Sequence, residues 1–285
     1  MKHFFSLLLV CVFALGYGQD FSVTFSSGKT LYFNITSKNT VAIAEGKQVV
    51  SHDDFWGINK YGYLFYGSLN IPATVTDNGV TYTVTEVGHL SGTNLTSVKI
   101  PNTVTKISDG AFSDCKELST ISLPSSLEFI GNNAFSRCPK LSHIELPESL
   151  QKIGSEAFAN SGLTSIIIPG NVNSIGFRAF DGCNNLISVE INEGVKILDA
   201  GSRSLSWSKC TFSKCHRLRT VKLPKSLLYY YYNYNIGTLC GSNCPEAMNA
   251  FSDCPSLEKI IVPIGTTAAF EKIISSEYDD KIVEE

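Results

Sequence analysis

The chain has 285 residues, of which 43% are hydrophobic and 11% aromatic, so it is long enough and apolar enough to bury a sizeable core. Its 23 basic and 26 acidic side chains give a net charge of −3, which excludes a disordered chain and a nucleic-acid binder that relies on bulk positive charge. Only 17% of the residues are charged, and Ser, Thr and Asn supply the surface polarity instead.

Residues 1–18 have the pattern of a secretory signal peptide. Lys2 precedes an apolar run over residues 4–15, and a small residue, Gly18, follows this run. The run is too short to cross a bilayer, so we expect cleavage near Gly18/Gln19 and a secreted or cell-surface mature chain. No later stretch reaches 18 consecutive apolar residues, so the sequence predicts no transmembrane segment after cleavage.

Residues 19–68 alternate between apolar and polar side chains, as in Phe21-Ser22-Val23-Thr24-Phe25. Such alternation is typical of half-buried strands, and it predicts an N-terminal β cap. Shortly afterwards, Asn78-Gly79 predicts a tight hairpin turn.

A repeat organises the rest of the chain. The pattern Leu-x-x-Ile/Val-x-Ile/Leu/Val occurs seven times, and all copies but the fifth, which has Asn192, continue with Pro. The copies start at Leu95, Leu118, Leu141, Leu163, Leu186, Leu218 and Leu257. Successive starts lie 22 or 23 residues apart, except for the last two intervals of 32 and 39 residues, which indicate two insertions.

Between these copies lies a second pattern, Leu-x-x-Ile-Gly-x-x-Ala-Phe-x-x-Cys, which starts in one unit at Leu127. Ile121 and Leu123 are two residues apart, so both point from a strand into the core, and Pro124 ends that strand. One coil cannot close a core alone, whereas stacked coils can, with each Phe covering its neighbour. We therefore expect one solenoid over residues 95–264, with short parallel strands that contain Ile121, Ile144, Ile166 and Val189.

In these Ile-Pro, Ile-Gly, Ala-Phe and Cys-x-x-Leu positions, the chain resembles the BspA-like bacterial leucine-rich repeat proteins. The resemblance covers residues 69–264, with insertions near 199–210 and 229–248, and residues 265–285 look like the closing helical cap. It implies a leucine-rich repeat solenoid of the α/β repeat class, mostly strands and loops with short helical turns and a parallel sheet on one face. It also implies a non-enzymatic adhesion or interaction role without a cofactor.

Eight cysteines remain after the signal peptide, and five of them share one repeat position. These five are Cys115, Cys138, Cys183, Cys215 and Cys254. Their side chains would run parallel in neighbouring coils, which suits a disulfide poorly, so we expect buried free thiols. Cys210, Cys240 and Cys244 lie in the insertions and are the candidates for a disulfide. Two thiolates at Cys240 and Cys244 fall short of the four ligands of a closed zinc site, so no metal is predicted.

Catalytic groupings are weak in this sequence. Ser51-His52-Asp53-Asp54 has suitable residue types, but adjacent residues do not face one another, and a solvated loop is the simpler interpretation. Cys215-His216 is a dyad only in sequence, because Cys215 points into the core and His216 then points elsewhere.

Candidate binding residues come from two places. The outward positions of the predicted sheet align into two rows, which include His143, Glu145, Ile167, Glu190 and Lys222. The second insertion adds Tyr230, Tyr232 and Tyr234, which favour recognition or else cover the flank of the solenoid. We expect a protein or glycan partner on a host or bacterial surface. The alternatives are a glycan-binding module for polysaccharide capture, and an enzyme with its site in residues 19–68.

Overall fold

The computed structural model describes residues 21–24, 29–44, 66–200, 211–228 and 251–285, apart from residues 252, 273 and 275. The expected signal peptide, the tyrosines of the second insertion and Cys210, Cys240 and Cys244 lie outside these residues. So do Ser51-His52-Asp53-Asp54. Within the described ranges, no helix is both long and apolar enough to cross a membrane.

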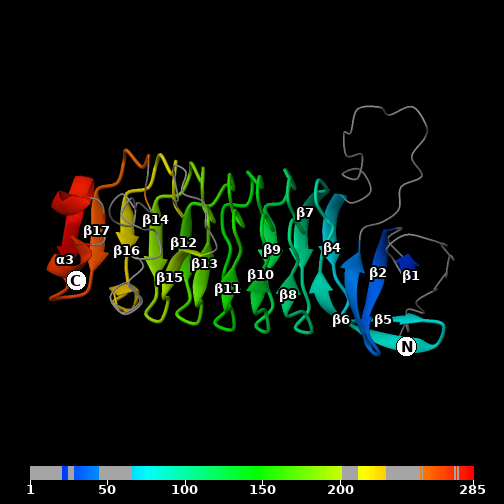
Figure 1. Ribbon diagram of the computed structural model, residues 1–285. Helices are drawn as coiled ribbons and strands as arrows, with labels where there is room; N and C mark the ends of the chain where they lie inside the picture. Colours follow the sequence, from blue (N-terminus) through cyan, green and yellow to red (C-terminus); the bar gives the residue numbers. More distant parts are fainter. Residues whose placement is uncertain are drawn as a thin grey trace, which may run out of the picture.

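The chain forms a solenoid whose coils stack side by side (Figure 1), and this confirms the predicted fold class. One side of the stack carries the front strands, and all of them except the first and the last contain the Ile or Val of the Leu-x-x-Ile/Val pattern. They are β4 (Tyr66–Asn70), β7 (Asn94–Lys99), β9 (Thr120–Ser122), β12 (Ser165–Ile168), β14 (Ser188–Ile191), β16 (Thr220–Lys222), β17 (Lys259–Val262) and β18 (Ile282–Glu284). Neighbouring strands pair in parallel, with Ile166 opposite Val189 and Val221 opposite Ile260. Equivalent repeat positions are therefore in register.

The front strands form two sheets rather than one. The first has the order β4-β7-β9 and the second β12-β14-β16-β17-β18. The predicted strand at Ile144 is wrong, because residues 141–147 form no strand, although Ile144 itself is buried. The coil keeps its inward packing but lacks the ladder that would join the two sheets.

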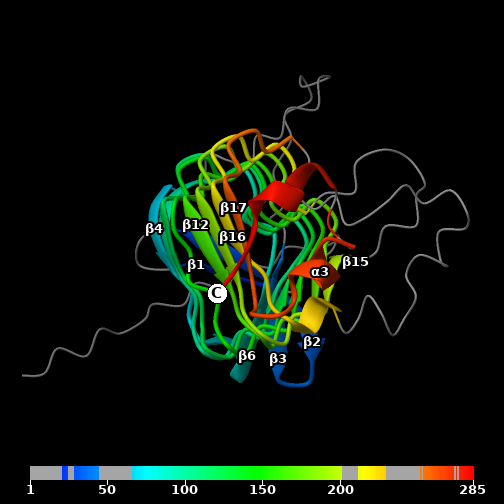
Figure 2. The ribbon, with the colours of Figure 1, turned by 90° about the vertical axis from the view of Figure 1, so that its left-hand side faces the viewer.

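A third sheet runs along the back of the coils, and the sequence predicted only its N-terminal part, the strands within residues 19–68 and the hairpin at Asn78-Gly79. Its strands are β1 (Phe21–Thr24), β2 (Thr30–Ser37), β3 (Thr40–Ala44), β5 (Thr74–Asp77), β6 (Val80–Val87), β8 (Lys106–Ile107), β10 (Phe129–Ile130), β11 (Lys152–Ile153), β13 (Ser174–Gly176) and β15 (Ile197–Ala200). Strands β1 to β3 pair antiparallel, and the path from β3 through β6 to β15 is parallel. Seen along the axis, front strands such as β4 and β12 and the back strand β15 lie on opposite sides of the coils (Figure 2).

The glycines that follow the back-strand isoleucines allow neighbouring coils to approach closely. A Cβ on Gly131 would lie 2.5 Å from Asp109 N, and a Cβ on Gly154 would lie 2.5 Å from Asn132 N. Backbone atoms cannot move aside as the end of a flexible side chain can, so a larger residue would push the coils apart. This explains the Ile-Gly pair of the repeat.

A stack of buried phenylalanines runs through the core and confirms the expected packing of coil on coil. The rings belong to Phe112, Phe135, Phe158, Phe180, Phe212 and Phe251. Successive centroids lie 5.0–5.9 Å apart, and the planes differ by 4–19°. Tyr278 closes the stack edge-on at 6.3 Å, and its hydroxyl donates to Phe251 O at 2.9 Å.

Turns at both ends follow from local residue choices. Asn78 and Gly79 have φ angles of 48° and 81°, as the predicted hairpin between β5 and β6 requires. The C-terminal segment contains α3 (Thr267–Phe270) and the 3-10 helix η3 (Ser276–Lys281). It then returns to the front side as β18, which pairs in parallel with β17. The C-terminal segment therefore contains a strand in addition to the helical cap that we expected.

Candidate binding surface

The outward side chains of the front strands, together with those of the coil at residues 141–147, form a surface that we call the front face. One row contains Ser97, Thr120, His143, Ser165, Ser188, Thr220 and Lys259, and the other contains Lys99, Ser122, Glu145, Ile167, Glu190, Lys222 and Ile261. All fourteen are half-buried or exposed, whereas the residues between the rows, such as Ile121 and Val189, are buried. The strand alternation thus places both rows toward solvent.

The structure brings three of the predicted binding residues together on consecutive strands. Ile167 on β12 lies opposite Glu190 on β14, which lies opposite Lys222 on β16. Glu190 Oε1 and Lys222 Nζ are 2.9 Å apart, and this hydrogen bond raises the pKa of Lys222. Ile167 is 57% exposed, so an apolar side chain stands beside an ion pair.

His143 and Glu145 lie one coil earlier, on the segment without a strand. His143 Nε2 is 3.5 Å from Glu145 Oε1, and both side chains are exposed. They share the front face with Ile167, but they lie on the coil that interrupts the sheet. The remaining predicted binding residues, Tyr230, Tyr232 and Tyr234, fall outside the described residues.

A hollow lies at the start of β14 and β16, and the sequence analysis missed it. It is lined by Ile187, Arg217, Arg219 and Ser256 and has a volume of about 290 Å³. Ile187 is 40% exposed, although its repeat position holds Thr or Ser in the preceding coils. That departure from Thr or Ser was the available sequence signal.

Cys115, Cys138, Cys183 and Cys215 are buried free thiols in the structure, and Cys254 is buried with its Sγ donating to Phe212 O at 3.0 Å. Cys138 Sγ donates to Phe112 O at 3.1 Å, and Cys183 Sγ donates to Phe158 O at 3.1 Å, each across to the preceding coil. Burial raises the pKa of the Cys183 thiol to about 11, so it stays protonated and unreactive near neutral pH. Sequence analysis gave these cysteines only an apolar packing role, whereas they also satisfy backbone carbonyls.

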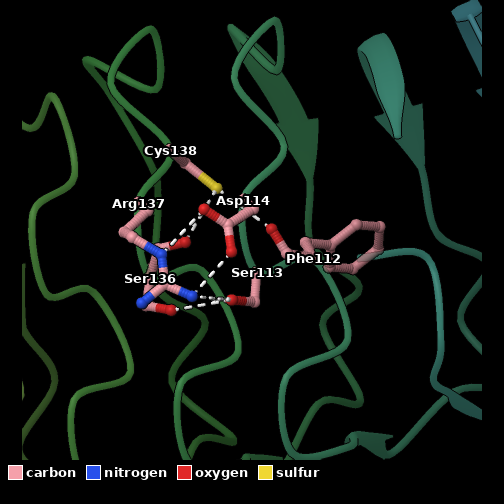
Figure 3. A network of polar contacts seen from close by, with 6 residues as sticks. All are labelled: Phe112, Ser113, Asp114, Ser136, Arg137 and Cys138. Atoms are coloured by element: carbon pink, nitrogen blue, oxygen red, sulfur yellow. Dashed lines mark hydrogen bonds and ion pairs between the residues drawn. The ribbon is translucent and has the colours of Figure 1, made fainter. Parts of the chain in front are cut away.

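The loop before each repeat cysteine carries polar contacts between coils, shown for two coils in Figure 3. Arg137 donates to both carboxylate oxygens of Asp114, at 2.7 and 2.6 Å. These hydrogen bonds lower the pKa of the Asp114 carboxyl. The pair links neighbouring coils at the edge of the solenoid, so its geometry indicates a structural role rather than a catalytic one.

A family model described as BspA type leucine rich repeat region, in six copies, matches residues 88–205 and 204–276. The chain belongs to this family. The match spans the stacked coils and includes the front strands β7 to β17, so the BspA-type repeats present the front face and the hollow. Leucine-rich repeats stack into extended surfaces that serve as binding modules.

Two solved structures show the same architecture. A leucine-rich repeat protein from Bacteroides ovatus ATCC 8483 is 26% identical, with a TM-score of 0.59 over 81% of this chain and 53% of that protein. The BspA-type chain therefore spans about half the length of the Bacteroides ovatus protein. The T. pallidum leucine rich repeat protein is 27% identical, with a TM-score of 0.53 over 68% of this chain and 80% of that one. No curated protein matches the chain.

The described part of this BspA-type chain offers little catalytic chemistry. No group of three or more His, Cys, Asp and Glu side chains in it could hold a metal ion. Cys215 Sγ donates to Phe180 O inside the core, while His216 is exposed and its Nε2 lies 3.5 Å from Asp253 Oδ2. The Cys215 thiol therefore lies in the core and the His216 ring at the surface, as we expected because adjacent residues point in different directions.

Proposed function

We propose that this BspA-type chain is an exported, non-enzymatic protein that binds a protein partner on a host or bacterial surface. The observation that carries the proposal is Ile167, which is 57% exposed on the sheet beside the Glu190–Lys222 ion pair. An apolar anchor with charged neighbours is typical of a protein interface, where a few buried side chains supply most of the affinity. Export is supported by the signal-peptide pattern of residues 1–18.

The rigidity of the front face supports the same role. Ile167 lies on β12, whose backbone pairs over four residues with β14, and β16 and β17 continue the ladder. Side chains on such a scaffold lose little conformational freedom on binding. The C-terminal half of the front face therefore suits a partner better than a loop of the same composition would.

A second function, glycan binding, is favoured by the composition of the second insertion. Residues 229–232 are four consecutive tyrosines, among them Tyr230 and Tyr232, and Tyr234 follows after one asparagine. Tyrosine offers a large apolar ring with a polar tip, which suits sugars as well as proteins. On this alternative, the chain captures polysaccharide at the cell surface, and the front face is a solvent-exposed sheet surface that binds no partner.

Capture from host-cell and bacterial surface extracts, together with a glycan array, separates the two functions. We expect Ile167→Asp to weaken capture of the protein partner at least fivefold, since loss of an interface anchor costs more than about 1 kcal/mol. Ser122→Asp is the matched control, because Ser122 occupies the same repeat position on β9 and gains the same charge. Equal capture by wild type and Ile167→Asp would contradict the proposal.

The tyrosine insertion is tested in the same assays with Tyr230, Tyr232 and Tyr234 replaced by Ser. Under the protein-binding proposal, this variant keeps its capture of the protein partner. A glycan-array signal that disappears in the triple variant, without any dependence on Ile167, would favour polysaccharide capture instead.

A further inference from the structure

The hollow beside the front face is built by three consecutive coils. Ile187 comes from the coil of β14, Arg217 and Arg219 come from the coil of β16, and Ser256 comes from the coil of β17. Arg219 N donates to Ile187 O at 2.9 Å, and Glu258 N donates to Arg219 O at 2.9 Å. These bonds between coils hold the backbone of the walls, so the hollow is part of the solenoid.

Positive charge is concentrated on the middle coil of the three. Residues 214–225 contain Lys214, Arg217, Arg219, Lys222 and Lys225 and no Asp or Glu, in a chain whose net charge is −3. A local excess of one sign attracts ligands of the opposite sign even when the whole protein has a different balance.

The two arginines of the hollow are only partly neutralised. Lys222 pairs closely with Glu190, but Arg219 Nε lies 3.7 Å from Glu258 Oε1, beyond hydrogen-bond distance. Arg217 is exposed and has no ion pair among the described residues. Two arginines therefore line one small hollow, and neither makes a close ion pair among the described residues.

We infer that this hollow binds one carboxylate side chain, Glu or Asp, of a protein partner. The inference rests on the proposed function, because it names the chemistry of the partner that meets the front face. Guanidinium groups bind carboxylates through paired, charge-assisted hydrogen bonds. Ile187 offers an apolar wall for the methylene stem of the acidic residue, and the Ser256 side chain adds a hydroxyl to the lining.

The surroundings favour a single carboxylate over an acidic polysaccharide. Glu190 and Glu258 stand on the two neighbouring coils and would repel a chain that carries a charge on every unit. A volume of about 290 Å³ is at the lower end of the usual range for ligand pockets and has room for one carboxylate side chain. None of the four lining residues is aromatic, so no ring is offered to stack on a sugar.

The test uses the mature chain and two synthetic probes, acetyl-Ala-Leu-Glu-Leu-Ala-amide and the same peptide with Gln in place of Glu. NMR spectra of the arginine side chains report binding directly. We expect the Glu peptide to shift the Nε–H signals of Arg217 and Arg219, with at least tenfold weaker binding of the Gln peptide. Arg217→Gln and Arg219→Gln should each weaken binding of the Glu peptide at least tenfold, with circular dichroism showing that each variant remains folded.

Lys214→Gln is the matched control, because it removes the same charge from the same coil at a residue that does not line the hollow. It should change the affinity less than about twofold. Similar losses in this control and in the arginine variants would overturn the inference, since bulk charge would then explain binding. Equal binding of the Glu and Gln peptides would overturn it too.

Tetragalacturonate, a short polyuronate, provides the remaining comparison. Binding of this sugar in place of the Glu peptide would overturn the assignment to a protein carboxylate. Failure of the peptide test leaves the effect of Ile167→Asp on partner capture untouched, so the inference and the proposed function fail separately. A peptide that binds while Ile167→Asp has no effect would support the carboxylate site and contradict the proposed function.

Discussion

Replacement of Phe135 by alanine removes one ring from the middle of the phenylalanine stack. The ring is fully buried, and its centroid lies 5.4 Å from that of Phe112 and 5.3 Å from that of Phe158, with planes that differ by 4° and 11°. A buried Phe→Ala change costs about 3–5 kcal/mol, because the transfer free energy is lost and a cavity remains. Because the ring stacks on two neighbours, we expect a loss in the upper part of this range, about 4–5 kcal/mol.

Phe129→Ala is the matched control for this change. Phe129 lies six residues earlier in the same coil, on β10, and its side chain is 37% exposed. The same chemical truncation there leaves no closed cavity, so we expect a loss of less than about 2 kcal/mol. Ser122→Ala, on the front face, should cost less than about 0.5 kcal/mol.

Urea titration followed by circular dichroism measures these losses, and hydrogen exchange locates them. Each coil contacts mainly its neighbours, so the amides of the coils around Phe135 should lose protection before those of the terminal coils. Equal losses of unfolding free energy for Phe135→Ala and Phe129→Ala would refute the reasoning, because the inward and outward assignment of the repeat would then be wrong.

Two further predictions concern contacts between coils, and a third concerns backbone strain. Gly154→Ala places a Cβ 2.5 Å from backbone atoms of the preceding coil. It should lower the free energy of unfolding by about 1–3 kcal/mol in urea titration. Ser108→Ala, at the equivalent position of the first coil, should cost about 1 kcal/mol or less, which is the value of one hydrogen bond. Arg137 lowers the pKa of Asp114, and this exposed ion pair should stabilise the fold by about 0.5–1 kcal/mol. That stability is present above the unfolded carboxyl pKa of about 4, and it is lost as the pH falls through the lower pKa of the folded state. The stability difference between wild type and Asp114→Asn should therefore shrink between about pH 6 and pH 2, and a constant difference would contradict the pairing. Lys214 is exposed with a φ of 54°, so Lys214→Gly should raise the thermal midpoint by relieving about 0.5–1 kcal/mol of strain, and a lower midpoint would contradict this.

The inward positions of the repeat could be predicted because they depend only on local spacing. Ile121 and Val189 recur two residues before a second apolar residue, and strand alternation alone directs both into the core. The role of Phe135 followed from repetition, since a large ring that recurs at a constant period must meet its equivalents in a stack. These features require no knowledge of distant contacts.

The two-residue back strands of the repeat units, and the reason why glycine follows their isoleucine, could not be predicted in the same way. Strands such as β10 contain two residues, of which only Ile130 points inward, and so they show no alternation for sequence analysis to detect. The need for glycine at Gly154 arises from the distance between coils, which no single repeat encodes. The missing strand at Ile144 belongs with these cases, because its motif is the same as that of its neighbours.

The front face was predictable as rows, whereas the hollow was not. Glu190 and Lys222 occupy equivalent positions in neighbouring coils, so their pairing follows from the repeat. The hollow combines Ile187 and Ser256, which are 69 residues apart in sequence because both insertions lie between them, although their coils are separated by only one other coil. Sequence periodicity identifies which residues are outward, but the shape between them depends on three coils at once.

The same geometry separates the residues that maintain the fold from those that are available for a partner. A side chain such as Phe135 is enclosed by its own coil and by both neighbouring coils, so any change there alters stability first. Ile167 and Arg217 contact solvent on the outer surface, where substitutions usually change stability by less than about 0.5 kcal/mol. A change in binding at these two positions therefore reports on recognition rather than on unfolding. This separation is what makes the proposed contacts of the front face and the hollow open to direct test in a folded protein.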